Sequence, residues 1–348
     1  MELTKKDHQM AKGIAIIGMV MLHLFCIKVD LPYTPLLWIG DTPLVYYLGL
    51  LGEICVPIYL FCSGYAQALL RYSDGAAYVK KSWIRILNFL LNYWIVLILA
   101  VILGAFFDSE KRIPGSILSF LENFFLYRFS YNGIWWFVST YIQLVALSPL
   151  ILKLIRRCPP VLTVLVSGAL YLASIFYIRL FDGHIENEIL AWIGKQVSLL
   201  VKSQFSFVIG CLCYEYKVMT KLRSLKHINL IALLLSPVLI ILMCILENAV
   251  FAPIFGLSLI LLFQSVKKPK FLCAVLCFFG AASTNIWLTH TFFFARIFPN
   301  LVYRAKYPLF IVLAMFALCF LASIVVNCLY RPLSKLLLDR LSKKTASH

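Results

Sequence analysis

The chain contains 348 residues, of which 62% are hydrophobic and only 14% are charged. Soluble domains average about 45–50% apolar and about 25% charged residues, and surface-to-volume scaling prevents one globule from burying so large an apolar excess. The composition therefore excludes a disordered chain, a collagen, a coiled coil and a small disulfide scaffold. It indicates an integral membrane protein.

Ten apolar segments are long enough to cross a membrane as helices, since a spanning helix needs about 20 apolar residues. Alternation typical of membrane strands is lacking, because runs such as 228–246 are apolar on every side. A shorter apolar segment, 116–129, carries polar residues and is predicted to be an interfacial or re-entrant helix. The fold class is therefore all-α and polytopic. The predicted spans are about 12–28, 44–66, 85–106, 134–153, 161–180, 197–215, 228–246, 249–266, 271–296 and 308–330.

The basic residues predict the orientation of these spans. Lys and Arg number 32 against 15 Asp and Glu, giving a net charge of +17. With the N-terminus in the cytoplasm, most basic residues fall in cytoplasmic segments, as the positive-inside rule requires. Both termini are therefore predicted to be cytoplasmic, and the charge implies no nucleic-acid partner. These basic residues are Lys5, Lys6, Lys12, Arg71, Lys80, Lys81, Arg85, Lys153, Arg156, Arg157, Lys217, Lys221, Arg223, Lys226, Lys267, Lys268, Lys270, Arg331, Lys335, Arg340, Lys343 and Lys344.

The eleven cysteines predict neither a disulfide framework nor a metal site. All but Cys158 lie within or beside apolar segments, where cysteine behaves as a small hydrophobic residue. No cluster combines cysteine and histidine at a spacing typical of zinc sites.

Ionisable residues inside the predicted spans are the functional candidates, because charge is costly in a bilayer and is retained there mainly for function. His23 lies in an otherwise apolar stretch, eleven residues after Lys12. Eleven steps of 100° bring the two residues to one helix face, about 16 Å apart along the axis. A neutral imidazole at that depth could act as a general base toward a hydroxyl. The alternative is a histidine that only packs against a neighbouring helix.

Other polar and small residues within or near the spans are further candidates. Glu53 could orient an imidazole or line a wet cavity, and Lys202 is a further cation inside a span. Lys81 and Arg85 could anchor a phosphorylated ligand, or reflect only the positive-inside rule. Ser63 and Gly64 in the second span could allow a close helix approach. His290 is a further ionisable residue inside a span.

Aromatic residues near an outer boundary also have two interpretations. Tyr131, Trp135 and Trp136 would be typical of an interfacial aromatic belt, and sugar stacking is the alternative.

Together these segments resemble the acyltransferase 3 family of membrane acyltransferases. Lys12 followed after ten residues by His23 resembles its basic-x10-His signature. Four further segments appear in the order in which the family has them. They are Lys12-Gly13-Ile14-Ala15, Val56-Pro57 with Ser63-Gly64-Tyr65, Trp135-Trp136-Phe137 with Leu147-Ser148-Pro149-Leu150, and Ile286-Trp287-Leu288-Thr289-His290.

One family element is incomplete. The cytoplasmic Arg-x-x-Arg motif, when aligned on Arg85, meets Ser82 at its first arginine and Asn88 at its usual proline. Basic charge is nevertheless present at Lys81. The resemblance therefore carries acyl-CoA binding to Lys81 and Arg85 at a shifted spacing.

The resemblance implies an acyltransferase 3-like transmembrane domain over residues 1–335 and a cytoplasmic basic tail over 336–348. It implies an O-acyltransferase that moves acetyl, or another short acyl group, from cytoplasmic acetyl-CoA to a hydroxyl of a cell-surface or exported glycan. Lys12, Lys81 and Arg85 would bind the donor. His23 would be the base or a transient acyl acceptor, and His290 a second acid or base, or a hydrogen bond that fixes the site. No metal is implied.

The same resemblance fits a multi-pass protein of a bacterial plasma membrane. Assembly into a homo-oligomer is an open alternative. The rival function is a transporter or flippase for a lipid-linked saccharide, which would also explain ten helices with scattered polar residues. The chain lacks paired spans broken by Gly or Pro in corresponding halves, a signal that many transporters carry. A third alternative is an acyltransferase-like sensor without turnover.

Overall fold

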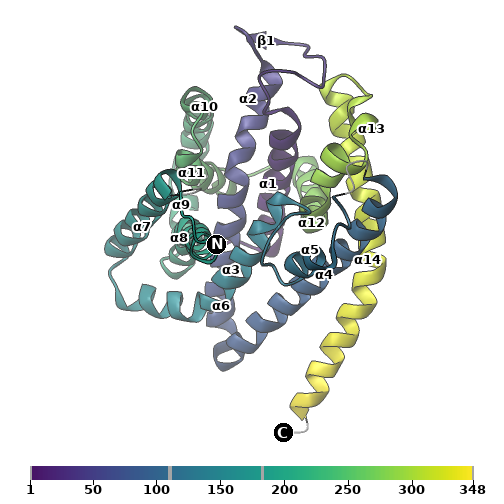
Figure 1. Ribbon diagram of the computed structural model, residues 1–348. Coiled ribbons are helices and arrows are strands. Elements are labelled where there is room, and N and C mark those ends of the chain that lie inside the picture. The colour runs from purple at the N-terminus through teal and green to yellow at the C-terminus, as the bar shows by residue number, and fades with distance from the viewer. Residues whose placement is uncertain (1, 109–111, 182–183, 347–348) are drawn as a thin grey trace. The chain divides into compact units, whose positions relative to one another are not determined.

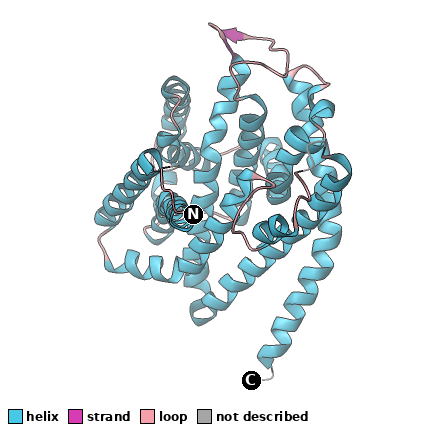
Figure 2. Ribbon diagram, in the orientation of Figure 1, coloured by secondary structure: helices cyan, strands magenta, loops and turns pink. Residues whose placement is uncertain are grey.

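The structure is a computed structural model that describes residues 2–108, 112–181 and 184–346. Within these ranges the chain is almost entirely helical (Figure 2). The exception is a short antiparallel hairpin, in which β1 (Trp38–Ile39) pairs with β2 (Thr42–Pro43). The prediction of an all-α protein is confirmed.

The chain forms two compact units, each assembled from separate stretches of sequence. The first unit comprises Met1–Gly18, Leu50–Val79 and Ser139–Gly280, and the second comprises Met19–Gly49, Lys80–Val138 and Ala281–His348. Because the dividing points fall inside α1 (Lys5–Phe25) and α12 (Lys270–Phe292), both helices contribute residues to each unit.

The α-helices of the first unit are labelled in Figure 1. In addition to the first part of α1 and of α12, the helical segments of this unit are η1 (Leu51–Ile54), α3 (Cys55–Asp74), η2 (Gly75–Ala77), most of α6 (Trp136–Arg157), α7 (Pro160–Phe181), α8 (Glu188–Glu215), α9 (Val218–Arg223), α10 (Ile228–Leu246), η4 (Ala249–Phe251) and α11 (Ala252–Ser265).

The second unit holds the remaining parts of α1, α6 and α12 together with all or most of seven further helical segments. They are α2 (Leu44–Leu50), α4 (Tyr78–Phe107), α5 (Ile117–Phe124), η3 (Gly133–Trp135), a π-helical turn η5 (Phe293–Ile297), α13 (Pro299–Tyr303) and α14 (Pro308–Ala346). The predicted basic tail belongs to the same helix as the last span, since α14 continues past residue 335.

Nine helices among the described residues are long and apolar enough to cross a membrane. They match nine of the ten predicted spans. The predicted span 249–266 is also helical, but its apolar helix Ala249–Ser265 is shorter than the others. The segment predicted to be interfacial forms the eight-residue α5, which Ser116 caps by accepting a hydrogen bond from the Ser119 amide.

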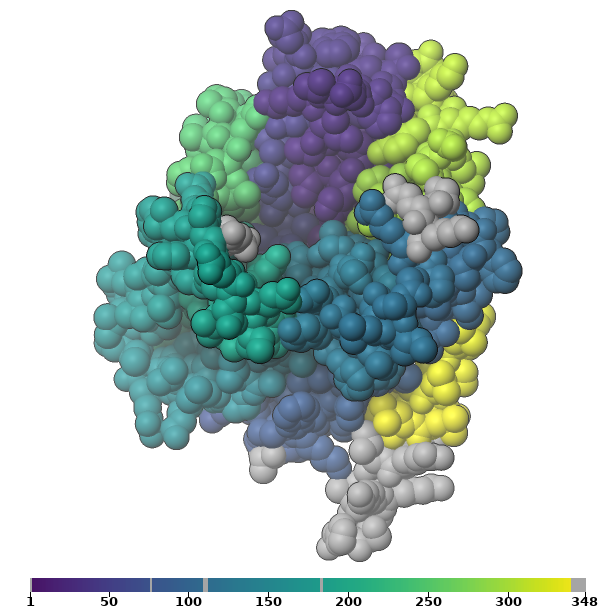
Figure 3. Space-filling model, in the orientation of Figure 1, coloured from purple at the N-terminus to yellow at the C-terminus, as the bar shows by residue number. Residues whose placement is uncertain are grey.

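Apolar side chains on the outside of the helices explain the composition. Only 22% of the apolar stretch of α7 is buried within the protein. Its residues Val161, Leu165 and Phe176 are exposed. Figure 3 shows α7, in teal, at the surface of the face in view. Exposing an apolar surface of this extent to water is unfavourable, whereas the hydrocarbon interior of a membrane can cover it. The chain is therefore a multi-pass membrane protein.

A glycine-mediated crossing joins α3 to α8 in the first unit. A Cβ atom added to Gly64 would lie 1.9 Å from the carbonyl oxygen of Phe207, and one added to Gly210 would lie 2.1 Å from that of Phe61. The two backbones are thus in direct contact on both sides of the crossing. This geometry confirms the close helix approach that the sequence suggests at Gly64, and it follows the small-residue packing common in membranes.

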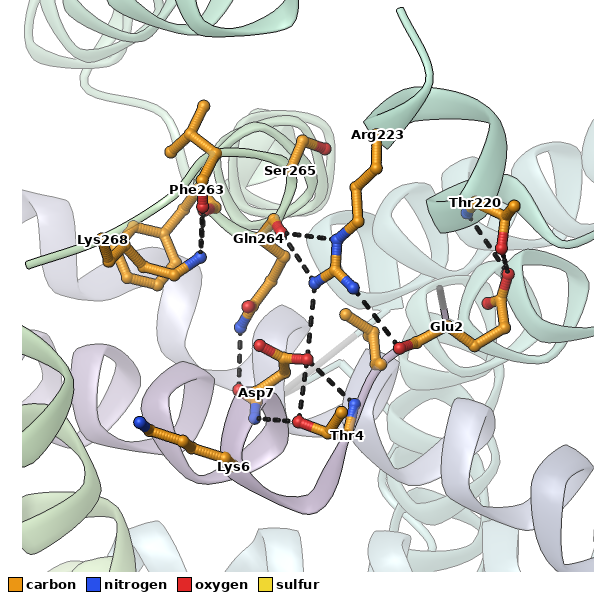
Figure 4. A network of polar contacts seen from close by, with 12 residues as sticks. Glu2, Thr4, Lys6, Asp7, Thr220, Arg223, Phe263, Gln264, Ser265 and Lys268 are labelled. Atoms are coloured by element: carbon orange, nitrogen blue, oxygen red, sulfur yellow. Dashed lines mark hydrogen bonds and ion pairs between the residues drawn. The ribbon is translucent and has the colours of Figure 1, made fainter. Parts of the chain in front are cut away.

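A polar network fastens the N-terminal segment within the first unit (Figure 4). The Arg223 guanidinium lies 3.4 Å from Asp7 and donates a 2.9 Å hydrogen bond to the carbonyl of Gln264. The Gln264 amide in turn donates to the Asp7 carbonyl. Thr220 donates to the Glu2 carboxylate. The start of α1 is therefore tied to α9 and to the end of α11.

Candidate functional site

His23 lies on the last turns of α1, in the part of that helix that belongs to the second unit. Its neighbours Val20 and Leu24 are fully buried, while His23 itself is half-buried. Tyr303 and Tyr33 donate hydrogen bonds to the last carbonyls of α1, those of Leu24 and Phe25. The helix end that carries His23 is thereby fixed.

These two tyrosines remain donors over the whole range of ordinary pH. Burial raises the pKa of Tyr303 to about 12, and burial also raises the pKa of Tyr33. Both hydroxyls therefore stay protonated. An α-helix leaves its last carbonyls without partners inside the helix, and the tyrosines satisfy two of them next to His23.

His290 lies near the end of α12 and is completely buried. Trp135 donates a hydrogen bond from its indole nitrogen to the carbonyl of Leu288, and Asn132 donates to the hydroxyl of Thr291. The α-helix then gives way to the π-helical turn η5, a distortion that occurs often at functional sites. The turn that carries His290 is thus held on both sides of the residue.

The two histidines, 267 positions apart in the sequence, form a direct hydrogen bond. The Nδ1 atom of His23 lies 2.8 Å from Nε2 of His290, and the ring centroids are 5.0 Å apart. The other nitrogen of His290, Nδ1, lies 3.0 Å from the carbonyl oxygens of Ile286 and Trp287. Both imidazoles are therefore part of one hydrogen-bonded chain that begins at the backbone of α12.

This chain fixes the proton positions of the neutral pair. A carbonyl oxygen can only accept, so His290 carries its proton on Nδ1 and donates to the backbone. Nε2 of His290 is then an acceptor, and His23 must donate to it from Nδ1. The remaining nitrogen of His23, Nε2, holds a lone pair and has no hydrogen-bond partner among the described residues. This arrangement leaves one basic nitrogen in the pair.

Such a nitrogen can take a proton from a hydroxyl or attack an acyl group. Its partner resembles the groups that orient catalytic histidines elsewhere, since the hydrogen bond at one ring nitrogen determines the role of the other. The structure therefore places His23 and His290 in direct contact, and their catalytic roles stay predictions.

The predicted donor-binding cations lie apart from that pair in the chain. Lys81 and Arg85 are both exposed and lie one turn apart on α4, in the second unit. Lys12 is half-buried on α1 and belongs to the first unit. Their roles in donor binding stay predictions.

Glu53 and Lys202 both belong to the first unit and attract each other electrostatically. Neither is among the hydrogen-bond partners of the two imidazoles in the described chain, which are each other and two carbonyls. Among the described residues no group of three or more His, Cys, Asp or Glu is placed to hold a metal ion.

The two interpretations of the aromatic residues were wrong for Trp135 and Tyr131. Both are buried, with 0% and 2% of their surface exposed, so neither can lie in an interfacial belt or stack on a sugar. Trp135 instead packs against Phe292 and Tyr93 and supports the helix that carries His290. Sequence position near a span boundary cannot distinguish a ring that faces the interface from one that faces a neighbouring helix.

Asn132 is a supporting residue that sequence reasoning missed. Its bond to Thr291 joins positions 159 residues apart, and no local pattern signals it.

The chain matches a known protein family. A family model described as an acyltransferase domain, that of the acyltransferase 3 family, matches residues 9–329, which include both histidines. Among curated proteins and among solved structures, none matches the chain.

Proposed function

Since the chain belongs to the acyltransferase 3 family and is a membrane acyltransferase, we propose that it transfers an acetyl or other short acyl group from cytoplasmic acyl-CoA. The proposed acceptor is a hydroxyl of a cell-surface or exported glycan, in a bacterial plasma membrane. The observation that carries this proposal is the hydrogen bond between His23 and His290, which leaves Nε2 of His23 as the basic nitrogen.

In the proposed reaction, Nε2 of His23 takes the proton of the acceptor hydroxyl while the oxygen attacks the thioester carbonyl. A carbon–oxygen bond forms and the carbon–sulfur bond breaks. The proton on His23 then passes to the departing CoA thiolate, which restores the neutral imidazole. General-base assistance of this kind contributes about 10²- to 10⁴-fold to a rate.

His290 is proposed as the group that orients His23. Its Nδ1 proton is committed to the backbone of α12, so its Nε2 can only accept from His23. The positive charge that develops on His23 would be shared through this hydrogen bond. Of the two roles that the resemblance implies for His290, a second acid or base and a hydrogen bond that fixes the site, we propose the second.

Lys81 and Arg85 are proposed to bind the phosphates of the donor. They are exposed neighbours on one face of α4, and arginine and lysine are the side chains that bind phosphate oxygens most often. Lys12 remains a further predicted cation for the same donor.

The test uses purified protein in detergent, with acetyl-CoA binding and slow hydrolysis as separate readouts. Wild type should bind and hydrolyse acetyl-CoA. Arg85→Ala should bind it more weakly, and His23→Ala should bind it normally but hydrolyse it at least 100-fold more slowly. A wild-type protein without affinity for acetyl-CoA would overturn the proposal and favour the transporter for a lipid-linked saccharide.

A further inference from the structure

A cluster of carboxamide side chains joins three helices of the second unit. Asn92 on α4 donates a 2.8 Å hydrogen bond from Nδ2 to Oδ1 of Asn285 on α12. Asn285 donates in turn to Ser323 at 3.0 Å and to Asn327 at 3.3 Å, both on α14. These helices are labelled in Figure 1. Hydrogen bonds between side chains are a common means of joining helices in a membrane.

One polar atom of this cluster, Oδ1 of Asn92, has no hydrogen-bond partner among the described residues. Asn285 uses its Oδ1 and both protons of its amide nitrogen. Oδ1 of Asn92 is buried, and only 7% of the residue is exposed. A buried acceptor without a donor costs the full desolvation penalty of that group. An atom of this kind in a packed interior requires an explanation.

A trapped water is a poor explanation. A buried water makes about three hydrogen bonds to polar groups that would otherwise lack partners. The described part of this cluster offers a single unpartnered acceptor, because Ser323 and Asn327 are already engaged with Asn285. A ligand that brings one donor on an otherwise apolar chain would match the site better.

The position of Asn92 on α4 indicates which ligand. Arg85 and Asn92 are seven residues apart, about two turns or 10 Å along one helix face. Between them on that face lies Asn88, whose Oδ1 accepts from Ser334 of α14. Arg85, which is proposed above to bind phosphate, is exposed on this helix face. Asn92, with its unpartnered amide oxygen, lies two turns further along the same face and is buried.

We propose that Oδ1 of Asn92 accepts a hydrogen bond from an amide N–H in the pantetheine arm of the acyl donor. This inference rests on the proposed function, because it assumes a CoA thioester. Such a donor carries phosphates at one end and secondary amides along an otherwise apolar arm, in the order that Arg85 and Asn92 present. The asparagine would select for the arm and hold it on α4.

The test compares two donors that differ only at the phosphate end. Acetyl-CoA carries the nucleotide and its phosphates, whereas S-acetylpantetheine carries the same two amides without them. Asn92→Leu removes the acceptor at similar volume and should raise the Kd of both donors by about tenfold, the effect of losing one buried hydrogen bond. Arg85→Ala should raise the Kd of acetyl-CoA alone.

Asn327→Leu is the matched control, because it removes a carboxamide from the same cluster but leaves Oδ1 of Asn92 in place. It should leave both Kd values near wild type at a comparable loss of melting temperature. Equal weakening by Asn327→Leu and Asn92→Leu would show a packing role and overturn the inference. So would unchanged binding in Asn92→Leu. Wild type that binds neither donor would instead refute the proposed function itself.

Discussion

At the scale of single residues, two backbone carbonyls of α12 determine which nitrogen of His23 is basic. The carbonyls hold the Nδ1 proton of His290, and His290 then accepts from Nδ1 of His23. Buried hydrogen-bonded chains of this kind act as a unit, so the loss of one member changes the behaviour of the others. The orientation of His23 should therefore depend on His290 more than on any group near its free nitrogen.

Replacing His290 with alanine tests this dependence. His23 would lose its only described hydrogen-bond partner and could rotate or change tautomer. We expect the kcat of acyl transfer to fall by about 10- to 100-fold, a typical effect of removing an orienting partner, while the Kd of acetyl-CoA changes little. The measurement is single-turnover transfer at saturating donor.

His227→Ala serves as the control, because His227 is exposed at the start of α10 and should leave kcat at the wild-type value. A His290→Ala protein that melts normally and retains full kcat would contradict the positioning role.

The sequence identifies the members of the pair but not their contact. His23 and His290 stand out because each interrupts an apolar span, and that signal is local. Their hydrogen bond spans 267 positions and depends on how α1 and α12 pack, which no local pattern encodes. Asn92 gave no local signal at all, since a single asparagine in a span is unremarkable until its partners are counted.

At the scale of helices, the packing of α3 on α8 depends on two glycines. Each glycine faces a backbone carbonyl of the other helix, at a distance that no Cβ atom could occupy. Since a carbonyl cannot rotate away as a side chain can, the helices would have to separate to admit even a methyl group. Overpacking of this type costs about 1–3 kcal/mol.

Gly64→Ala should therefore lower the melting temperature of the protein in detergent, as followed by tryptophan fluorescence. Gly168→Ala is the matched control on α7, where the nearest atom to an added Cβ is a ring carbon of Phe205 at an ordinary 3.7 Å. There alanine should leave stability unchanged or raise it, because alanine favours the helix by up to about 1 kcal/mol over glycine. Equal melting temperatures for both variants would contradict the close crossing.

Helix positions were the most predictable feature of the fold. Apolar length alone located nine spanning helices and the shorter helix Ala249–Ser265. It could not show which face of each helix meets lipid, because long apolar runs such as α10 carry no periodic signal. For the same reason the burial of Trp135 beneath α12 was not predictable.

At the scale of the whole molecule, the distribution of charge predicts the orientation in the membrane, and the family membership shows the class of reaction. Most basic residues lie in the segments predicted to be cytoplasmic. The positive-inside rule therefore predicts that both termini and the stretch from Lys81 to Arg85 lie on the cytoplasmic side. The family match over residues 9–329 supplies the class of reaction. Acceptor identity depends on surfaces that carry no comparable signal, so the glycan remains a proposal drawn from the resemblance.

The most direct measurement of the central claim uses sealed membrane vesicles and acetyl-CoA labelled in the acetyl group. Inside-out vesicles containing wild type should transfer the label to glycan, and those containing His23→Ala should not. Right-side-out vesicles should be inactive until they are permeabilised, because acetyl-CoA could not reach the cytoplasmic face. Label transfer by His23→Ala at the wild-type rate, or by sealed right-side-out vesicles, would contradict the account.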